Sequence, residues 1–94
     1  MYTEMLDDMT FQQVANIATK LSSPPNNDEK GLLYGLYKQT LFGNINIEQP
    51  VFYRFEARAK WDSWKKQENK SSEKAEQEYR ELVVKLCQKY GKNK

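Results

Sequence analysis

Apolar residues recur at intervals of three and four along most of the chain, which is the spacing of one face of an α-helix. In residues 11–22 this stripe consists of Phe11, Val14, Ala15, Ala18 and Leu21. Thr10 is a suitable N-cap for such a helix. Pro24 and Pro25 would end it, because proline lacks a backbone N–H and restricts the residue before it. No segment alternates convincingly with period two, so the pattern predicts an all-α fold.

A second helix is predicted to begin near Asn26, with Glu29 three residues later as a capping-box partner. It should run to residue 42, where Gly43 is free to adopt the left-handed conformation that closes a helix. Residues 44–53 have no helical stripe and contain Pro50, so they are expected to form a loop.

Two more helices are expected in the second half of the chain. One is predicted over residues 55–67, and the last runs from about Ser71 to near Gly91. The last helix carries six apolar residues on one side: Ala75, Tyr79, Leu82, Val83, Leu86 and Tyr90. The sequence therefore predicts a small all-α bundle of four helices.

Composition limits the function classes. The chain has 94 residues, enough for one domain, and its net charge of +2 is too balanced for a nucleic-acid-binding surface spread over the whole protein. It contains no histidine, the commonest metal ligand and the side chain that titrates nearest neutral pH. Cys87 is the only cysteine, which excludes an intrachain disulfide and a metal site of several thiolates. We expect no metal site, no cofactor and a reducing compartment.

The two ends of the chain are expected to lie outside the domain. Residues 1–9 form an extension whose apolar residues also follow helical spacing, so it could pack or dimerise. Residues 92–94 form a basic tail, which leaves residues 10–91 as the domain. The N-terminus is acidic, unlike a secretory signal, and no apolar run approaches a membrane span, so we expect a cytoplasmic location.

The predicted helix over residues 26–42 has two distinct sides. One gathers the leucines expected to contact the core: Leu32, Leu33 and Leu36. The other mixes aromatic, basic and small residues: Lys30, Gly31, Tyr34, Tyr37, Lys38 and Leu41. Aromatic faces and ammonium groups are what an adenine ring with phosphates requires. The alternative is that both tyrosines cover the edges of the core while Lys38 is solvated.

Other segments repeat this chemistry. Lys60 lies one helical turn before Trp64, next to Trp61, and Tyr79 lies on the last helix. Core packing is an equally simple interpretation of Tyr79 and of at least one tryptophan. Three helices that each offer an aromatic ring or a lysine indicate a nucleotide site without specifying it.

The order of these residues resembles the acyl-CoA-binding proteins. Their signature is Tyr-x-x-Tyr-Lys-Gln, a glycine, a proline and then Lys-Ala-Lys-Trp-x-x-Trp. This chain has "YGLYKQTLFGNINIEQP" followed by "ARAKWDSW". The match runs without a gap from about residue 11 to the closing "KYG" at residue 91. It implies a four-helix bundle in up-down-down-up order that binds medium- or long-chain acyl-CoA without catalysis. It further implies a role as an acyl-CoA pool former and carrier in lipid metabolism, with residues 10–91 as the acyl-CoA-binding domain.

The resemblance also implies ligand contacts at specific positions. Tyr34, Lys38 and Lys60 fall where the family contacts the CoA phosphates. Tyr37 falls where the adenine stacks, and Tyr79 where the nucleotide is contacted from the last helix. A close backbone approach is implied at Ala15.

Several positions depart from the family pattern. Lys30 and Gly31 stand where larger apolar residues usually line the acyl chain, which makes them candidates for an altered acyl-chain groove. Thr19 stands where a ligand-contacting lysine is frequent, and Asn44 replaces the usual aspartate in a turn that should stay intact. Headgroup recognition is expected to be preserved, while the chain-length preference stays open.

Two rival functions are weaker. An enzyme would need Cys87 as a nucleophile, yet the chain has no histidine to activate it. A nucleic-acid or protein-interaction module would need a concentrated basic stripe, but residues 65–78 alternate in sign. We expect a monomer that binds acyl-CoA and no nucleic acid. Acyl-CoA-consuming enzymes and, transiently, membrane surfaces are its expected further partners.

Overall fold

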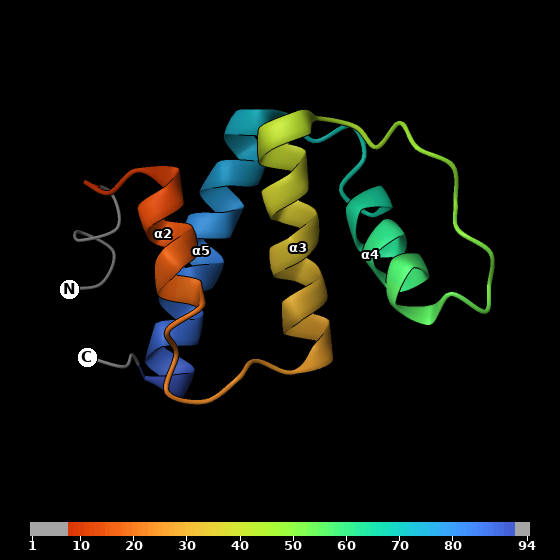
Figure 1. Cartoon of the computed structure of the whole chain (residues 1–94). Coiled ribbons are helices and arrows are strands. Elements are labelled where there is room, and N and C mark those ends of the chain that lie inside the picture. The colour runs from red at the N-terminus through yellow and green to blue at the C-terminus, as the bar shows by residue number, and fades with distance from the viewer. Residues whose placement is uncertain (1–7, 92–94) are drawn as a thin grey trace.

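The computed structural model describes residues 8–91 of the chain. Four helices and no strand occur in this range: α2 (Phe11–Ala18), α3 (Asn27–Phe42), α4 (Phe55–Lys65) and α5 (Ser72–Tyr90). In Figure 1, α3 and α4 run in the same direction while α2 and α5 run in the opposite direction, which gives the up-down-down-up order. The predicted fold class is confirmed. The expectation for residues 1–7 and 92–94 lies outside the described residues.

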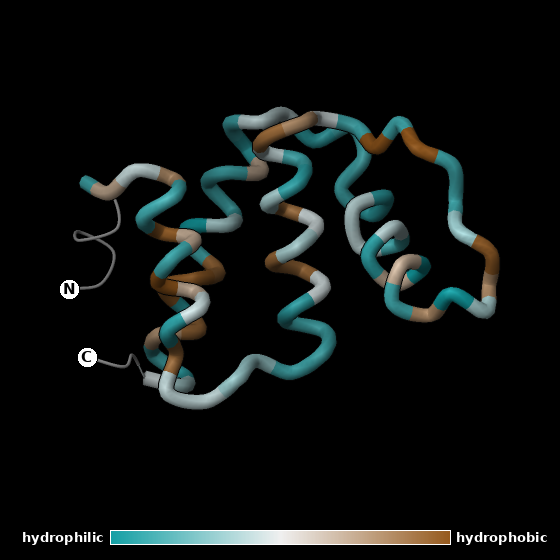
Figure 2. The backbone as a smooth tube through the Cα atoms, viewed as in Figure 1, coloured by the Kyte–Doolittle hydropathy of each residue, from teal (hydrophilic) through white to brown (hydrophobic). Residues whose placement is uncertain are grey.

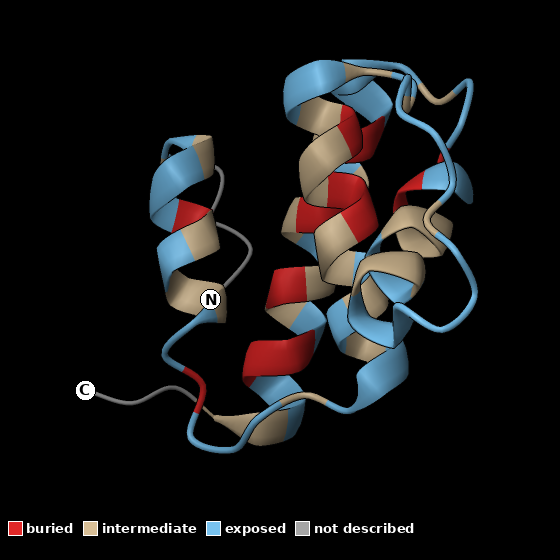
Figure 3. Cartoon of the chain, turned by 45° about the vertical axis from the view of Figure 1, so that its right-hand side comes forward, coloured by how far each residue is buried: buried red, intermediate tan, exposed pale blue. Residues whose placement is uncertain are grey.

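Helix α3 is the centre of the arrangement. It packs against α5 on one side and against α4 on the other, whereas α2 packs mainly against α5. Figure 3 shows the buried segments concentrated on α3 and α5. Helix α4 is therefore held chiefly by its contact with α3. No helix in residues 8–91 is both long and apolar enough to cross a membrane.

The predicted starts of α2 and α3 are confirmed by side-chain caps. The Thr10 hydroxyl accepts a hydrogen bond from the Gln13 N–H at 3.1 Å, and the Gln13 side chain accepts one from the Thr10 N–H at 2.8 Å. Asn26 and Glu29 form the same reciprocal capping box, with both bonds at 2.8 Å. Each box satisfies backbone donors that have no partner inside the helix.

Some of the predicted helix ends agree with the structure, and others do not. Gly43 and Gly91 have φ angles of 74° and 79°, in the region that favours glycine, and both close helices as predicted. Helix α2 ends at Ala18, four residues before the predicted end. The Thr19 hydroxyl donates to the Asn16 carbonyl at 2.7 Å, which replaces the next helical bond by a turn.

The core lies between α2, α3 and α5. Its fully or almost fully buried members are Val14, Leu21, Leu36, Ala75, Tyr79, Val83, Leu86 and Cys87. All of these except Cys87 belong to the predicted apolar stripes. Cys87 lies at the edge of the stripe on α5. The prediction that Leu32 contacts the core is wrong, because this residue is 45% exposed. Leu32 instead lines a cavity beside α4.

Helices α3 and α4 approach closely where α3 lacks side chains. A Cβ atom at Gly35 would lie 2.2 Å from the Ser63 carbonyl oxygen, so only glycine fits there. Trp64 is buried next to this contact, as expected for one of the tryptophans, and its Nε1–H donates to the Gly43 carbonyl at 2.8 Å. Gly35 is therefore the residue at which α3 and α4 pack most closely.

The long connection between α3 and α4 is partly fixed and partly exposed. The Trp61 Nε1–H donates to the Ile47 carbonyl at 2.9 Å. Nearby, the buried Gln39 amide donates to the Asn44 side chain at 2.9 Å and to the Lys70 carbonyl at 2.7 Å, so the turn with Asn44 is intact. Figure 2 shows hydrophobic residues along this connection, where several apolar side chains are exposed.

Candidate functional site

Tyr34 lies between two lysines from different helices. The Nζ atoms of Lys38 on α3 and Lys60 on α4 are each 5.8 Å from the centre of the Tyr34 ring. The packing of α4 on α3 at Gly35 brings Lys60 to this position. Lys60 also forms an ion pair of 3.3 Å with Glu56, but both side chains are exposed, so the pair adds little and can open for another anion.

Lys38 is held over aromatic rings. Its Nζ lies 4.9 Å from the centre of the Phe42 ring and 5.7 Å from that of Trp64. Cation–π contacts of this kind orient an ammonium group while leaving its N–H donors available. Lys38 and Lys60 thus present two positive charges around the Tyr34 ring.

A groove lies between α2 and α3, with α5 beneath it; we call it the α2–α3 groove. Its volume is about 310 Å³, and Ala15, Lys30, Tyr34, Tyr37 and Tyr79 are among the residues that line it. Thr19 lines it as well, at the position where the family frequently has a lysine.

The aromatic residues of this groove are packed on one another. Phe11 stacks on Tyr37 with ring centres 5.4 Å apart, and it contacts Tyr79 at 5.0 Å. The Gln12 amide donates to the Tyr37 hydroxyl at 3.2 Å. Burial, with a smaller contribution from Tyr37, raises the pKa of Tyr79 to about 12, so its phenol is neutral at physiological pH.

A second groove lies between α3 and α4; we call it the α3–α4 groove. It has a volume of about 560 Å³ and a mostly apolar lining that includes Lys30, Gly31, Tyr34, Phe55 and Lys60. Lys30 and Tyr34 line both grooves, so the two meet across the N-terminal half of α3.

The structure brings all eight predicted site residues into one region. Seven line one or both grooves, and Lys38 reaches the region through its contact with Tyr34. Sequence spacing did not indicate Phe11 and Gln12 as supports of Tyr37, because it places Phe11 only in the core stripe. It also missed Phe55, which is 77% exposed at the rim of the α3–α4 groove and had no distinguishing signal.

Comparison with known proteins identifies the family. The sequence model of the acyl CoA binding protein family matches residues 8–83. The chain belongs to the acyl-CoA-binding protein family. It is 40% identical over 78 residues to acyl-CoA-binding domain-containing protein 6 of Arabidopsis thaliana, covering 83% of this chain and 85% of the relative. It is 39% identical over 81 residues to the acyl-CoA-binding protein of Saccharomyces cerevisiae, covering 86% and 93% of the two chains.

Solved structures of the family share the fold. The crystal structure of Oryza sativa acyl-CoA-binding protein 2 superposes with a TM-score of 0.80 at 38% identity, covering 84% of this chain and 86% of that one. The solution structure of the yeast acyl coenzyme A binding protein gives a TM-score of 0.67 at 38% identity, covering 86% and 94%. The arrangement of α2 to α5 is therefore the family fold.

Proposed function

We propose that the protein binds medium- and long-chain acyl-CoA thioesters without catalysis and acts as an acyl-CoA pool former and carrier. The observation that carries this proposal is Tyr34 with its two flanking lysines, at the junction of a groove with several aromatic residues and a mostly apolar groove. This ligand has a charged aromatic head and an apolar tail, and the region offers a complementary surface for each.

The CoA head fits the basic and aromatic part of the region. Lys38 and Lys60 supply ammonium groups for the phosphates, and the Tyr34 hydroxyl adds a donor. Tyr37, supported by Phe11, offers a fixed ring for the adenine in the α2–α3 groove, which Ala15 and Tyr79 also line. Exposed phosphates are well solvated, so these contacts fix orientation more than they add affinity.

The acyl tail fits the α3–α4 groove. Burial of each methylene contributes about 0.8 kcal/mol, so a sixteen-carbon chain contributes roughly 10 kcal/mol before the cost of ordering it. Lys30 and Gly31 line this groove, and in this proposal they lie beside the chain. Affinity should therefore rise with chain length until the groove is full.

A binding protein of this kind acts by mass action. It lowers the free concentration of a detergent-like metabolite and releases it to acyl-CoA-consuming enzymes or, transiently, to membrane surfaces. We propose that residues 10–91 are the binding unit and that it works as a cytoplasmic monomer. The absence of histidine and the burial of Cys87 favour binding without hydrolysis or acyl transfer.

Calorimetric titration with acyl-CoAs of increasing chain length tests this proposal, with free CoA and free fatty acid as controls. We expect weak binding of CoA, affinity that rises with chain length, and poor binding of the fatty acid. Equal affinity for all of these would contradict the proposal. Intact palmitoyl-CoA after prolonged incubation would support a non-catalytic role, and displacement by an oligonucleotide at moderate salt would favour the nucleic-acid alternative.

A further inference from the structure

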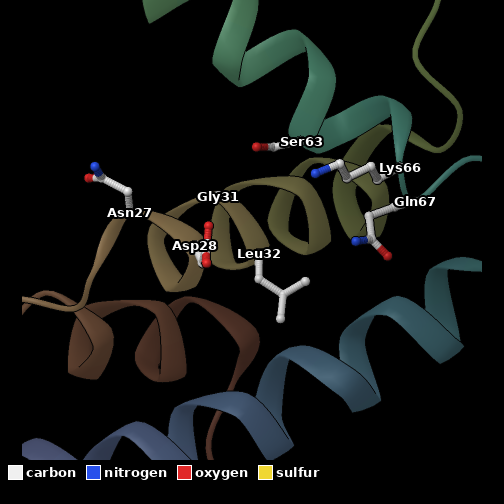
Figure 4. A pocket seen from close by; sticks show the side chains of 7 residues that line it. All are labelled: Asn27, Asp28, Gly31, Leu32, Ser63, Lys66 and Gln67. Carbon is white, nitrogen blue, oxygen red and sulfur yellow. The ribbon is translucent and has the colours of Figure 1, made fainter.

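A third cavity lies behind the α3–α4 groove, on the opposite face of the same two helices. It has a volume of about 450 Å³ and shares Asn27, Gly31 and Ser63 with the groove. Figure 4 shows this back cavity with the side chains of Ser63 on α4 and Lys66, directly after α4, directed into the space beside α3. The groove and the back cavity are therefore two sides of one cleft.

The wall between the two sides is thin. A Cβ atom at Gly31 would lie 2.8 Å from the Ser63 Oγ, so a larger residue at position 31 would close the cleft against α4. In this chain only the hydroxyl of Ser63 stands there, and it can rotate away at little cost. The end of an acyl chain in the groove can therefore reach the back cavity.

The back cavity differs chemically from the groove. It contains the Asp28 carboxylate, the Lys66 ammonium and the Gln67 amide. Gln67 is only 6% exposed, and Figure 4 shows its amide nitrogen turned toward Leu32, on the wall of the cavity. Its amide oxygen accepts a hydrogen bond from Lys70 at 2.7 Å, whereas the nitrogen has no partner among residues 8–91. This nitrogen is not among the fully buried atoms of the described residues, so it is open to the cavity and can donate a hydrogen bond to an acceptor there.

The charges indicate which acceptor fits. Lys66 and Asp28 form no ion pair with each other or with another described residue, and one positive and one negative group leave the cavity neutral overall. A carboxylate would meet repulsion from Asp28. A hydroxyl group is neutral, accepts from Lys66 or Gln67, and donates to Asp28.

We propose that this protein accepts acyl-CoA thioesters that carry a hydroxyl group at the far end of the chain, with the hydroxyl in the back cavity. This inference rests on the proposed function, because the chain must first occupy the α3–α4 groove. It names a substrate class that a purely apolar groove would reject. Such a groove would bind the hydroxylated chain about 10- to 100-fold more weakly than the plain one, because the hydroxyl would be buried without a partner.

Titration calorimetry with paired ligands tests the proposal. The probes are dodecanoyl-CoA and hexadecanoyl-CoA, each with and without a terminal hydroxyl, on the wild type, Lys66→Met and the matched control Lys65→Met. For at least one of the two chain lengths, we expect the affinity for the hydroxylated ligand to be no more than about threefold weaker than the affinity for the plain ligand. Lys66→Met should weaken that ligand by about fivefold and leave the plain chain unchanged, and Lys65→Met should change neither.

Each other outcome contradicts the proposal in a recognisable way. Hydroxylated ligands more than about threefold weaker at both lengths would contradict the proposal, and a loss of about tenfold or more would show a purely apolar site. An equal effect of Lys66→Met on both ligands of a pair, or no effect on either, would show that the hydroxyl does not reach the cavity. Failure of plain hexadecanoyl-CoA to bind would instead refute the proposed function itself.

Discussion

The two grooves beside α3 are built in different ways. The α2–α3 groove has α5 beneath it, and its aromatic residues pack directly on the main core through Tyr79. The α3–α4 groove has one wall from α4, a helix held mainly by its close contact at Gly35 and by the hydrogen bond of Trp64. The surface proposed for the head is thus part of the core, whereas the surface proposed for the tail depends on one attached helix. Changes in tail preference can arise there without disturbing the head site.

The largest effect should come from filling the space between α3 and α4. Gly35→Ala is expected to lower the free energy of unfolding by about 3 kcal/mol, because the new Cβ meets a backbone carbonyl that cannot move alone. The matched control Gly31→Ala meets only the Ser63 hydroxyl and should change stability by less than about 1 kcal/mol. Urea unfolding of both variants measures the difference. Equal values would show that α4 is not fixed at Gly35.

A smaller effect is expected at the proposed head site. Lys38→Ala should weaken acyl-CoA and free CoA alike, by about tenfold, because it removes a charged contact to the head. The exposed Lys65 offers a matched control, and Lys65→Ala should leave both affinities unchanged. Calorimetry with both ligands decides, and unchanged affinity of Lys38→Ala for both would refute the role of Lys38.

The proposed tail site should respond to ligand length instead. Gly31→Leu is expected to weaken the longest acyl-CoAs by about fivefold while sparing free CoA, because the new side chain fills the cleft beside Ser63. The affinities of a chain-length series for the variant and the wild type give the comparison. A uniform loss that includes free CoA would indicate damage to the fold and not to the groove.

The smallest effect concerns a contact that joins the start of α3 to the end of α5. Glu29 accepts hydrogen bonds from Lys89 at 2.8 Å and from Tyr90 at 2.6 Å, besides its bond to the Asn26 backbone. These contacts, Lys89 first, lower the pKa of Glu29 from 4.5 to about 2. The stabilisation is therefore complete above pH 4.5 and is lost as the pH falls toward 2.

Thermal unfolding across this pH range checks the role of Glu29. Glu29→Gln should lower the melting temperature at neutral pH, and its difference from the wild type should shrink on acidification. Glu48→Gln, at an exposed position in the connection, serves as the control. A difference that stays constant down to pH 2 would show that the carboxylate charge does not contribute.

Local features of the fold were predictable, and tertiary features were not. The caps at Thr10 and Asn26 and the stop at Gly43 depend on neighbouring residues, so the sequence contains them. Leu32 was assigned to the core because periodicity gives the direction of a side chain but not the helix that covers it. The contact of Gln39 with the Lys70 carbonyl joins positions 31 residues apart, and no local pattern predicts it.

The candidate site divides in the same way. Spacing alone indicated a face with Tyr34, Tyr37 and Lys38, and left core packing open as an alternative. The family resemblance supplied the specific roles of Lys60 and Tyr79. The two grooves, their junction at Tyr34 and the polar cavity behind Gly31 depend on how α4 packs on α3, which requires the structure.

A crystal structure of the protein with hexadecanoyl-CoA tests the central claim most directly. We predict the adenine against Tyr37 in the α2–α3 groove, the phosphates within hydrogen-bond distance of Lys38 and Lys60, and the acyl chain between α3 and α4. A ligand bound elsewhere, with no nucleotide atom near Tyr34, Tyr37 or Lys60, would contradict the account.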